Sequence, residues 1–281
     1  LYMKPESLHK HIVFLAKKSP QKTALLTCGH EGNISEEITY RQLMEKIENA
    51  ARYFYALGAK KGDRVALSFG NCADLLILSW AAWCLGIVTV PMDVKRDTGE
   101  QYRYKLKLNN AKLLITQKNV LENIELRYLE GIKVIEFSRM ADGFDAKNIP
   151  WEDGLSHTAV ILFTSGTTSN PKGAKLTLEN LFTNAKGIQE WLHITHEDRF
   201  LINLPLHHIN STTFCLATLL SGGSIAIPPN YSNSHFWKYA SKTEATLTSI
   251  VQSVIFDQLS REGEYLKVKN NLKLNRVQIC S

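Results

Sequence analysis

Residues 164–173, with the sequence T-S-G-T-T-S-N-P-K-G, gather hydroxyl side chains, two glycines and a lysine in one short segment. Glycines let a backbone approach a ligand closely, N–H groups and hydroxyls donate to phosphate oxygens, and lysine supplies positive charge. An apolar run at residues 159–163 precedes the segment and predicts a buried strand. Apolar residues at helical spacing follow it over residues 178–192, with Thr177 as the N-cap. A strand, this loop and a helix in succession predict a polyphosphate-binding loop.

Two other interpretations of the segment exist. The first is the Walker loop, G-x-x-x-x-G-K-[ST]. Counted from Gly166, Pro171 stands where the second glycine is required and Gly173 stands where the Mg²⁺-binding hydroxyl is required. Because proline lacks an N–H and has a fixed φ, this chain cannot form the Walker nest. The second interpretation is an ordinary surface loop, which the density of phosphate donors between strand and helix disfavours.

The segment resembles the phosphate-binding signature of the adenylate-forming enzymes, which include acyl- and aryl-CoA synthetases, peptide-synthetase adenylation domains and luciferases. Residues 163–168 and 171–173 fit the pattern [YF]-[TS]-S-G-[TS]-[TS]-G-x-P-K-G, while Ser169 stands where the family usually has glycine. Other stretches resemble family motifs in the same order along the chain: residues 38–43, 61–66, 83–93, 110–115 and 204–210. The last of these resembles the family's L-P-L-F-H-x-x-[GN] segment.

The resemblance implies an α/β fold of stacked, mostly parallel β-sheets with helices on both faces, the fold of the N-terminal domain of these enzymes. Residues 1–281 are expected to form a partial, truncated N-terminal domain, with subdomains of about 60–195 and 1–59 plus 196–281. Residues 274–281 are expected to be a buried strand. The family's later Y-G-x-T-E and T-G-D motifs and its lysine-bearing C-terminal domain are absent from the sequence, so the chain alone is expected to be inactive.

Periodicity gives the same architecture independently of the resemblance. Strands are expected at residues 23–27, 64–69, 87–90, 112–116, 132–137, 199–204 and 224–227. Helices are expected at residues 7–17, 39–57, 74–85, 99–108, 211–220 and 235–241. Thr39 is the expected N-cap of the second of these helices, and Gly58 ends it. Short strands alternating with helices predict parallel sheets covered on both sides.

By resemblance, the function is that of an ATP-dependent, AMP-forming acid–thiol ligase, which activates a carboxylic acid as acyl-adenylate and releases pyrophosphate. ATP and Mg²⁺ are the implied cofactors, with CoA as co-substrate of the complete enzyme. Thr164 is the implied Mg²⁺ contact, and Lys172 would hold the β- and γ-phosphates with the hydroxyls of Thr167 and Thr168. The implied nucleotide-binding residues are Thr164, Ser165, Gly166, Thr167, Thr168, Lys172 and Gly173.

Two adjacent histidines follow the L-P-L stretch. His208 aligns with the family histidine that lies between the nucleotide and acyl sites, and is therefore the implied catalytic residue. His207 replaces a residue that is usually aromatic and is expected to act through packing. A histidine pair that only packs or caps locally is the alternative interpretation. The other histidines, such as His193 and His196, lack further ligands at metal-like spacing.

The substrate class is partly indicated. Amino-acid-activating relatives place an aspartate shortly after the L-P-L-x-H stretch, whereas residues 210–214 contain no acid. This favours a small-molecule acyl or aryl carboxylic acid over an amino acid. Two alternatives stay open, namely an amino-acid-adenylating domain and a non-catalytic nucleotide-binding or interaction protein derived from this fold.

Composition limits the other classes. The chain has 281 residues, 44% hydrophobic content and a net charge of +6 from scattered lysines and arginines, without the basic stripe of a nucleic-acid binder. Its five cysteines are odd in number and form no C-x-x-C pair, which predicts free thiols in the reducing cytoplasm. The most apolar run, residues 75–90, is shorter than the ~20 residues that span a bilayer, so no integral membrane segment is expected.

Overall fold

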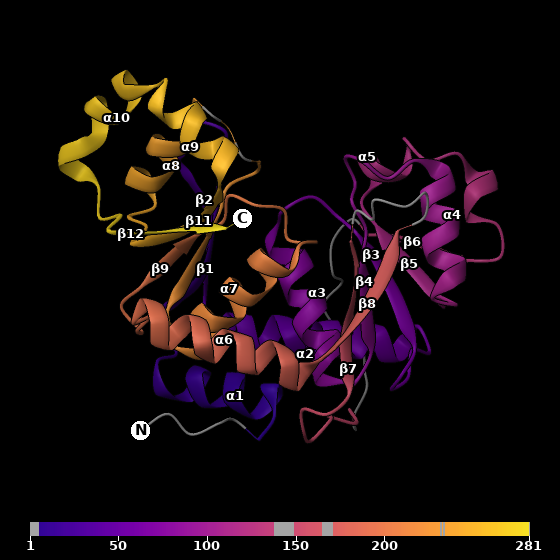
Figure 1. Ribbon diagram of the computed structural model, residues 1–281. Helices are drawn as coiled ribbons and strands as arrows, with labels where there is room; N and C mark the ends of the chain where they lie inside the picture. The colour runs from indigo at the N-terminus through magenta and orange to yellow at the C-terminus, as the bar shows by residue number, and fades with distance from the viewer. Residues whose placement is uncertain (1–5, 138–148, 165–170, 231, 233, 281) are drawn as a thin grey trace. The chain divides into compact units, whose positions relative to one another are not determined.

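The computed structural model describes residues 6–137, 149–164, 171–230, 232 and 234–280, with Thr164 described for its backbone alone (Figure 1). The chain divides into two compact units. The first unit comprises Leu1–Phe14, Met44–Phe69 and Asp74–Asn180, and the second comprises Leu15–Leu43, Gly70–Ala73 and Leu181–Ser281. Each unit is built on a sheet of its own.

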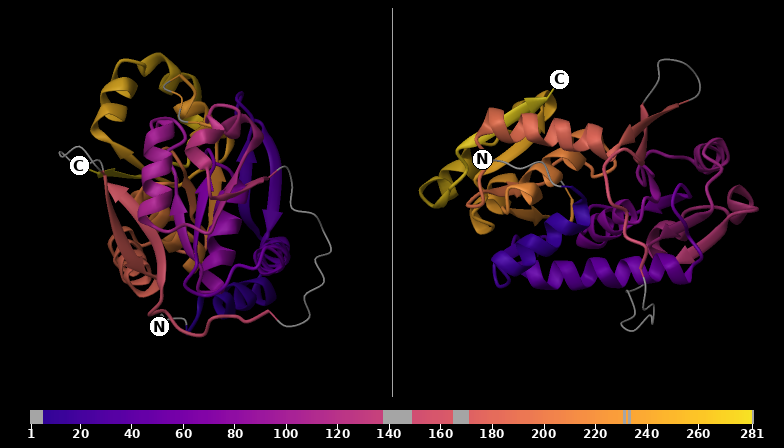
Figure 2. Two further views of the ribbon diagram at one scale, coloured as in Figure 1. Left: turned by 90° about the vertical axis from the view of Figure 1, so that its right-hand side faces the viewer. Right: turned by 90° about the horizontal axis from the view of Figure 1, so that it is seen from below.

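The sheet of the first unit has the strand order β6-β5-β3-β4-β7-β8 over the described residues. Its strands are β3 (Arg64–Ser68), β4 (Val88–Pro91), β5 (Leu113–Thr116), β6 (Lys133–Glu136), β7 (Thr158–Thr164) and β8 (Lys172–Thr177). Neighbouring strands are parallel, except that β8 pairs with β7 in the antiparallel direction. The β7–β8 pair is thus a hairpin at the edge of a parallel sheet, and Figure 2 shows it from two further sides.

Helices cover both faces of this first sheet. On one face, Tyr102 of α4 (Gly99–Leu108) packs in a core cluster with Ala66 of β3, and Figure 1 shows α4 beside β5 and β6. On the other face, the indole Nε1 of Trp83 in α3 (Ala73–Cys84) donates to Thr89 Oγ1 at 2.9 Å. The other helical elements with most of their residues in this unit are α1 (Leu8–Lys18), α2 (Tyr40–Ala56), α5 (Lys118–Leu121) and η1 (Leu126–Leu129).

The sheet of the second unit has the order β12-β11-β9-β10-β1-β2 within the described chain. Its strands are β1 (Thr23–Cys28), β2 (Ile34–Thr39), β9 (Arg199–Leu201), β10 (Ser224–Ile227), β11 (Leu247–Val251) and β12 (Arg276–Cys280). All pairs are parallel except β1 with β2. The helices with most of their residues in this unit are α6 (Leu178–Leu192), α7 (Ile209–Leu220), α8 (Phe236–Lys242), α9 (Gln252–Leu259), α10 (Glu262–Val268) and η2 (Lys269–Asn271).

Successive residues of the second sheet face different helices. Phe200 stacks on Phe214 of α7, with ring centroids 5.1 Å apart. The next residue, Leu201, belongs instead to a core cluster with Tyr239 and Ala240 of α8. Because neighbouring side chains of a strand point to opposite faces, α7 and α8 cover opposite sides of the sheet. Two-sided burial explains why most strands are apolar runs in the sequence.

The predicted fold class is confirmed, and so are the predicted ends of α2. Thr39 Oγ1 accepts from Gln42 N at 3.3 Å while Gln42 Oε1 accepts from Thr39 N at 2.8 Å, which makes a reciprocal capping box. Gly58 follows the helix with a φ of 77°, a left-handed conformation that glycine adopts at low cost.

Three expectations need correction. The edge strands β2 and β8 were not predicted, because their exposed residues interrupt the apolar pattern. The strand predicted at residues 199–204 ends at Leu201. The last strand, β12, is not buried, since it lies at the edge of the described sheet with Val277 45% and Ile279 53% exposed.

Candidate functional site

The signature segment connects the two strands of the β7–β8 hairpin. Thr164 pairs with Lys172 at the end of the hairpin where the loop connects the strands, and Phe163 pairs with Gly173. Four predicted nucleotide-binding residues, Ser165, Gly166, Thr167 and Thr168, lie outside the described residues. The structure therefore describes the stem of the predicted phosphate loop.

The helix that was expected to follow the loop directly does not do so. Strand β8 intervenes, and α6 begins at Leu178, beside the start of β7. At about 3.3 Å per residue, five strand steps separate that helix terminus from Lys172 by about 17 Å. The helix dipole, which acts within about one turn, is too far away to contribute to phosphate binding. The predicted N-cap is confirmed, because Thr177 Oγ1 accepts from Asn180 N at 3.1 Å.

Close packing requires glycine at position 173. A Cβ built there would lie 2.9 Å from Ile161 Cγ2 and 3.5 Å from Phe163 Cζ, both of the neighbouring strand. The first distance is too short for carbon atoms, so any other residue would require the Ile161 side chain or the strand that carries it to shift. Gly173 thus holds the two ends of the loop at their observed separation.

Lys172 is exposed at the end of the hairpin stem. Within the described part of the chain, its ammonium takes part in no hydrogen bond or ion pair. A lysine without a protein partner keeps its full charge available for an anionic ligand. Lys175, farther along β8, is exposed in the same way.

A buried ion pair contacts β7 of the hairpin stem. The Lys105 ammonium bonds both carboxylate oxygens of Asp97 at 2.6 and 2.7 Å, and the two side chains are each 6% exposed. Asp97 Oδ2 also accepts from Asp93 N at 2.9 Å. The same ammonium lies 5.0 Å from the ring centroid of Phe163, a cation–π contact. The pair thereby fixes the last side chain before Thr164.

His208 belongs to the second unit, at the turn between β9 and α7. It occupies the N-cap position of α7 with a φ of −95° and a ψ of 146°, yet its side chain makes no capping hydrogen bond. The imidazole is exposed, and the half-buried ring of His207 lies 4.3 Å away at an interplanar angle of 49°. The His208 side chain therefore does not serve helix capping, which was one local alternative.

Hydroxyl groups of α7 hold the turn from the C-terminal side. Ser211 Oγ donates to the Leu204 carbonyl at 2.9 Å. Thr212 Oγ1 lies 3.1 Å from the carbonyls of both Leu206 and His208. The carboxamide of Asn71 also contacts this turn, and sequence reasoning missed it because nothing in the L-P-L-x-H motif points to a residue so distant along the chain.

A cavity of about 650 Å³ begins immediately after His208 in the second unit. Ile209, Asn210 and Phe214 of α7 line it on one side, and Trp191 of α6 and Cys280 of β12 also contribute. Asn210 Nδ2 donates to Cys280 Sγ. None of the described lining residues is charged.

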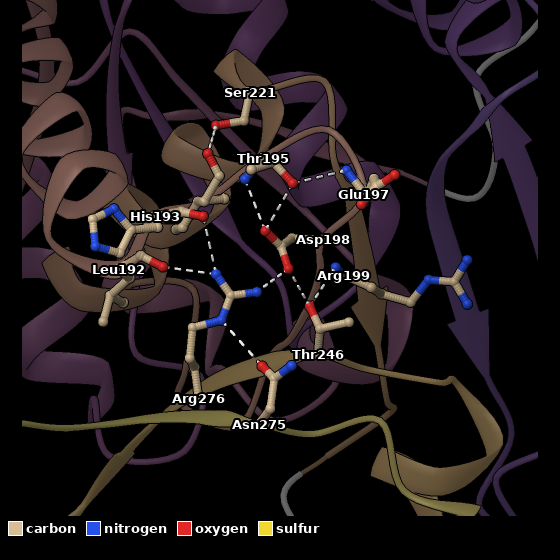
Figure 3. A network of polar contacts seen from close by, with 11 residues as sticks. Leu192, His193, Thr195, Glu197, Asp198, Arg199, Ser221, Thr246, Asn275 and Arg276 are labelled. Atoms are coloured by element: carbon tan, nitrogen blue, oxygen red, sulfur yellow. Dashed lines mark hydrogen bonds and ion pairs between the residues drawn. The ribbon is translucent and has the colours of Figure 1, made fainter.

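A polar network fixes the two elements that frame this cavity (Figure 3). Arg276, the first residue of β12, donates to the carbonyls of Leu192 and His193 at 2.7 and 3.1 Å, at the end of α6. Its guanidinium also pairs with Asp198, which is 5% exposed. Asp198 accepts further bonds from Thr195 N and Thr246 Oγ1 at 2.8 and 2.7 Å.

The Asp198 carboxylate is held in its charged form. Burial raises its pKa, but the hydrogen bonds from Thr195 and Thr246 and the pairing with Arg276 outweigh burial, so its pKa lies below the usual value. Because Arg276 satisfies the last carbonyls of α6 at the same time, the network ties the helix end to β12.

Metal-binding side chains are sparse. No group of three or more His, Cys, Asp or Glu side chains suited to a metal ion occurs among the residues that the structure describes. The predicted Mg²⁺ contact, Thr164, has no described side chain. These residues do not amount to a magnesium site by themselves.

The hairpin with its signature loop, on a two-sheet α/β frame, is the arrangement of a nucleotide-binding enzyme. The family model of AMP-binding enzymes matches residues 15–280, and the chain belongs to this family.

The curated relatives include CoA ligases of bacteria. The crotonobetaine/carnitine–CoA ligase of Salmonella paratyphi B is 29% identical over 259 residues, covering 83% of this chain and 48% of the relative. The ligase of the same name from Escherichia coli O139:H28 is 29% identical over 265 residues, covering 86% and 50%. The chain thus spans about half the length of the curated relatives it matches.

Solved structures share the fold. The O-succinylbenzoate coenzyme A synthetase MenE from Bacillus subtilis, in complex with AMP, matches with a TM-score of 0.82 at 22% identity, over 96% of this chain and 67% of that one. The N-terminal domain of FACL13 from Mycobacterium tuberculosis matches with a TM-score of 0.85 at 21% identity, over 98% and 70%. Among the described helices, none has both the length and the apolar character needed to cross a bilayer.

Proposed function

We propose that this chain is part of an acyl- or aryl-CoA synthetase that converts a carboxylic acid and ATP into acyl-adenylate and pyrophosphate, and then transfers the acyl group to CoA. The observation that carries the proposal is the β7–β8 hairpin. It presents the family's phosphate signature with Lys172 exposed and opposite Thr164, and without a protein partner in the described chain.

The chemistry follows from charge. When a carboxylate oxygen attacks the α-phosphorus of ATP, the bond to the β-phosphate oxygen breaks and negative charge accumulates on the departing pyrophosphate. Groups already in place to meet this charge lower the barrier without reorganisation. Lys172, on a stem fixed by Gly173 and by the Lys105–Asp97 pair, is the group that we assign to the β- and γ-phosphates.

Magnesium would neutralise further phosphate charge when bound. Among the described residues, no group of three or more His, Cys, Asp or Glu side chains could hold it.

The cavity next to His208 is the site that we assign to the acid. It starts at Ile209, directly after the histidine that the family resemblance places between the nucleotide and acyl sites. Its described lining is apolar or neutral, so the ammonium of an amino acid would find no counter-charge there. This supports an acyl or aryl acid, and it disfavours the amino-acid-adenylating alternative.

The free cysteines agree with a cytoplasmic enzyme. No disulfide joins the five cysteines, all of which lie among the described residues, and burial raises the pKa of Cys28 to about 11, which keeps this thiol protonated and unreactive.

The test is acid-dependent exchange of labelled pyrophosphate into ATP by the full-length protein. A panel of straight-chain, branched and aryl acids is compared with the standard amino acids. We expect exchange with at least one acyl or aryl acid and none with amino acids. Exchange driven by an amino acid would support the amino-acid-adenylating alternative. ATP binding without exchange for any acid would support a non-catalytic nucleotide-binding protein.

A further inference from the structure

The turn that leads to His208 leaves backbone groups without ladder partners. Ile202 N still bonds the Ala226 carbonyl at 3.0 Å, which continues the β9 pairing by one residue. Beyond it the chain leaves the sheet, and Pro205 has no N–H to donate. The carbonyl of Leu204 and the N–H of Leu206, on either side of the proline, therefore need partners from elsewhere.

Asn71 supplies both partners. Its Nδ2 donates to the Leu204 carbonyl at 3.1 Å, and its Oδ1 accepts from Leu206 N at 2.9 Å. Asn71 lies in Gly70–Ala73, which belongs to the second unit with the turn, although the two are separated by more than 130 residues in sequence. A carboxamide that uses its donor and its acceptor at once has one orientation, so it fixes the distance between the two groups it bridges.

The turn is thus held on two sides. Ser211 and Thr212 hold it from α7, within a few residues of His208. Asn71 holds it from a different part of the chain. Of these side chains, only Asn71 ties the turn to a segment outside the β9–α7 connection.

We infer that Asn71 is a positioning residue for His208. It sets the path of the Leu204–Leu206 backbone and thereby the place of the imidazole two residues later, without touching substrate. This inference rests on the proposed function, because it assumes that His208 takes part in adenylation. It extends that function to Asn71, a residue that lies outside all the family motifs found in the sequence.

A matched control is available in the same unit. Gln189 of α6 is 8% exposed, and its Nε2 donates to the Ala217 carbonyl at 2.8 Å and to Ser221 Oγ at 2.7 Å. It is another amide that joins distant backbone, but it holds the end of α7 opposite to His208. Loss of Gln189 should cost stability through the same kind of bond without moving the histidine.

The experiment is a double-mutant cycle in the full-length protein, with kcat/KM for adenylation and Tm measured for each variant. Asn71→Ala should lower kcat/KM about 10- to 100-fold, the range expected when a catalytic group is misplaced by about 1 Å. In the His208→Ala background, the same change should have little further effect on kcat/KM. Gln189→Ala should lower Tm. The effect of His208→Ala on kcat/KM should be the same with and without Gln189→Ala.

Each outcome has one meaning. If the effects of Asn71→Ala and His208→Ala on kcat/KM multiply, Asn71 is structural only and the inference is wrong, while the proposed function stands. If His208→Ala keeps wild-type kcat/KM although the protein adenylates an acid, the role of His208 is wrong and the inference falls with it.

A second variant keeps the test valid if Asn71→Ala fails to fold. Asn71→Asp retains the acceptor for Leu206 N but loses the donor to Leu204, whose carbonyl is still bonded by Ser211. It should fold and show the same coupling to His208, and additive effects in this variant would equally overturn the inference.

Discussion

Lys172 and Gly173 are adjacent in sequence but differ in what they require of the fold. Lys172 is exposed and free of protein partners in the described chain, so its replacement should leave the core intact. A Cβ at Gly173 would lie too close to the Ile161 side chain of β7. Under the proposed function, Lys172 supplies charge, while Gly173 leaves room for the Ile161 side chain.

Gly173→Ala should open the hairpin stem. Because the new Cβ would lie 2.9 Å from Ile161 Cγ2, we expect a loss of unfolding free energy of about 1–3 kcal/mol, typical of overpacking, and weaker ATP binding. Gly263→Ala in α10 is the control, since a Cβ there meets nothing within 4 Å. It should be neutral or stabilising by a few tenths of a kcal/mol. Urea unfolding of both variants measures the difference. Equal effects would show that the Ile161 side chain does not restrict the residue at position 173.

At the scale of elements, the ion pair beneath the hairpin joins α4 to the preceding turn. Both side chains of the Lys105–Asp97 pair are almost fully buried, so removal of one leaves an uncompensated charge in the core. Variants of this pair therefore test how the stem of the loop is supported.

Lys105→Met should destabilise the chain by about 3–5 kcal/mol, because the Asp97 carboxylate would remain buried without its partner. The double variant Lys105→Met with Asp97→Leu removes both charges and should recover most of that loss. Chemical denaturation of the single and double variants measures the difference. A double variant as unstable as the single one would mean that the network around Asp97, including the Asp93 N–H, matters more than the charge pair.

The network at the end of α6 predicts a dependence of stability on pH. The pKa of Asp198 is lower in the folded chain than its ordinary value, so its contribution is complete above that value and is lost as pH falls through the folded pKa. Stability should therefore decline as the pH falls below 3.8, the ordinary pKa of an aspartate, in part through this residue. Asp198→Asn should be less stable at neutral pH, and its stability should fall less steeply over the acid range. Identical slopes for variant and wild type would exclude a contribution from Asp198.

The elements also show what a sequence can reveal. Strands such as β5 and β10, buried along their whole length, are apolar runs and were predicted to within a residue or so at each end. Strand β8 has exposed residues at positions 172–175 and was missed, because pairing with β7 forms it rather than its own pattern. Strand β12 was predicted in place but not in burial, since exposure depends on which strands are its neighbours.

The candidate site divides in the same way. Local chemistry marks Lys172 and Gly173 in the sequence, because they lie in a segment whose residue types indicate a phosphate ligand, while the family resemblance marks His208. Asn71 and Asp198 act through partners that lie far along the chain, Leu204 for the first and Arg276 for the second. Tertiary contacts of that kind leave no periodic or motif-like trace, and only the folded structure identifies them.

At the scale of the whole molecule, two units carry different parts of the proposed reaction. The first unit carries the phosphate hairpin, and the second carries His208 and the neutral cavity. The chain belongs to the AMP-binding enzymes, and under the proposed function both parts would serve one activity. We propose that the hairpin lysine, Lys172, acts on the polyphosphate of ATP.

The most direct test compares Lys172→Ala with Lys175→Ala in the full-length protein. The two lysines are exposed on the same strand, so loss of either should change stability little. A charge-assisted phosphate contact made in the transition state is worth about 2–4 kcal/mol, or about 30- to 1000-fold in rate. Measured as acid-dependent pyrophosphate release, Lys172→Ala should slow adenylation by that factor while Lys175→Ala stays within a few-fold of wild type. Wild-type kinetics for Lys172→Ala, or an equal loss in both variants, would contradict the account.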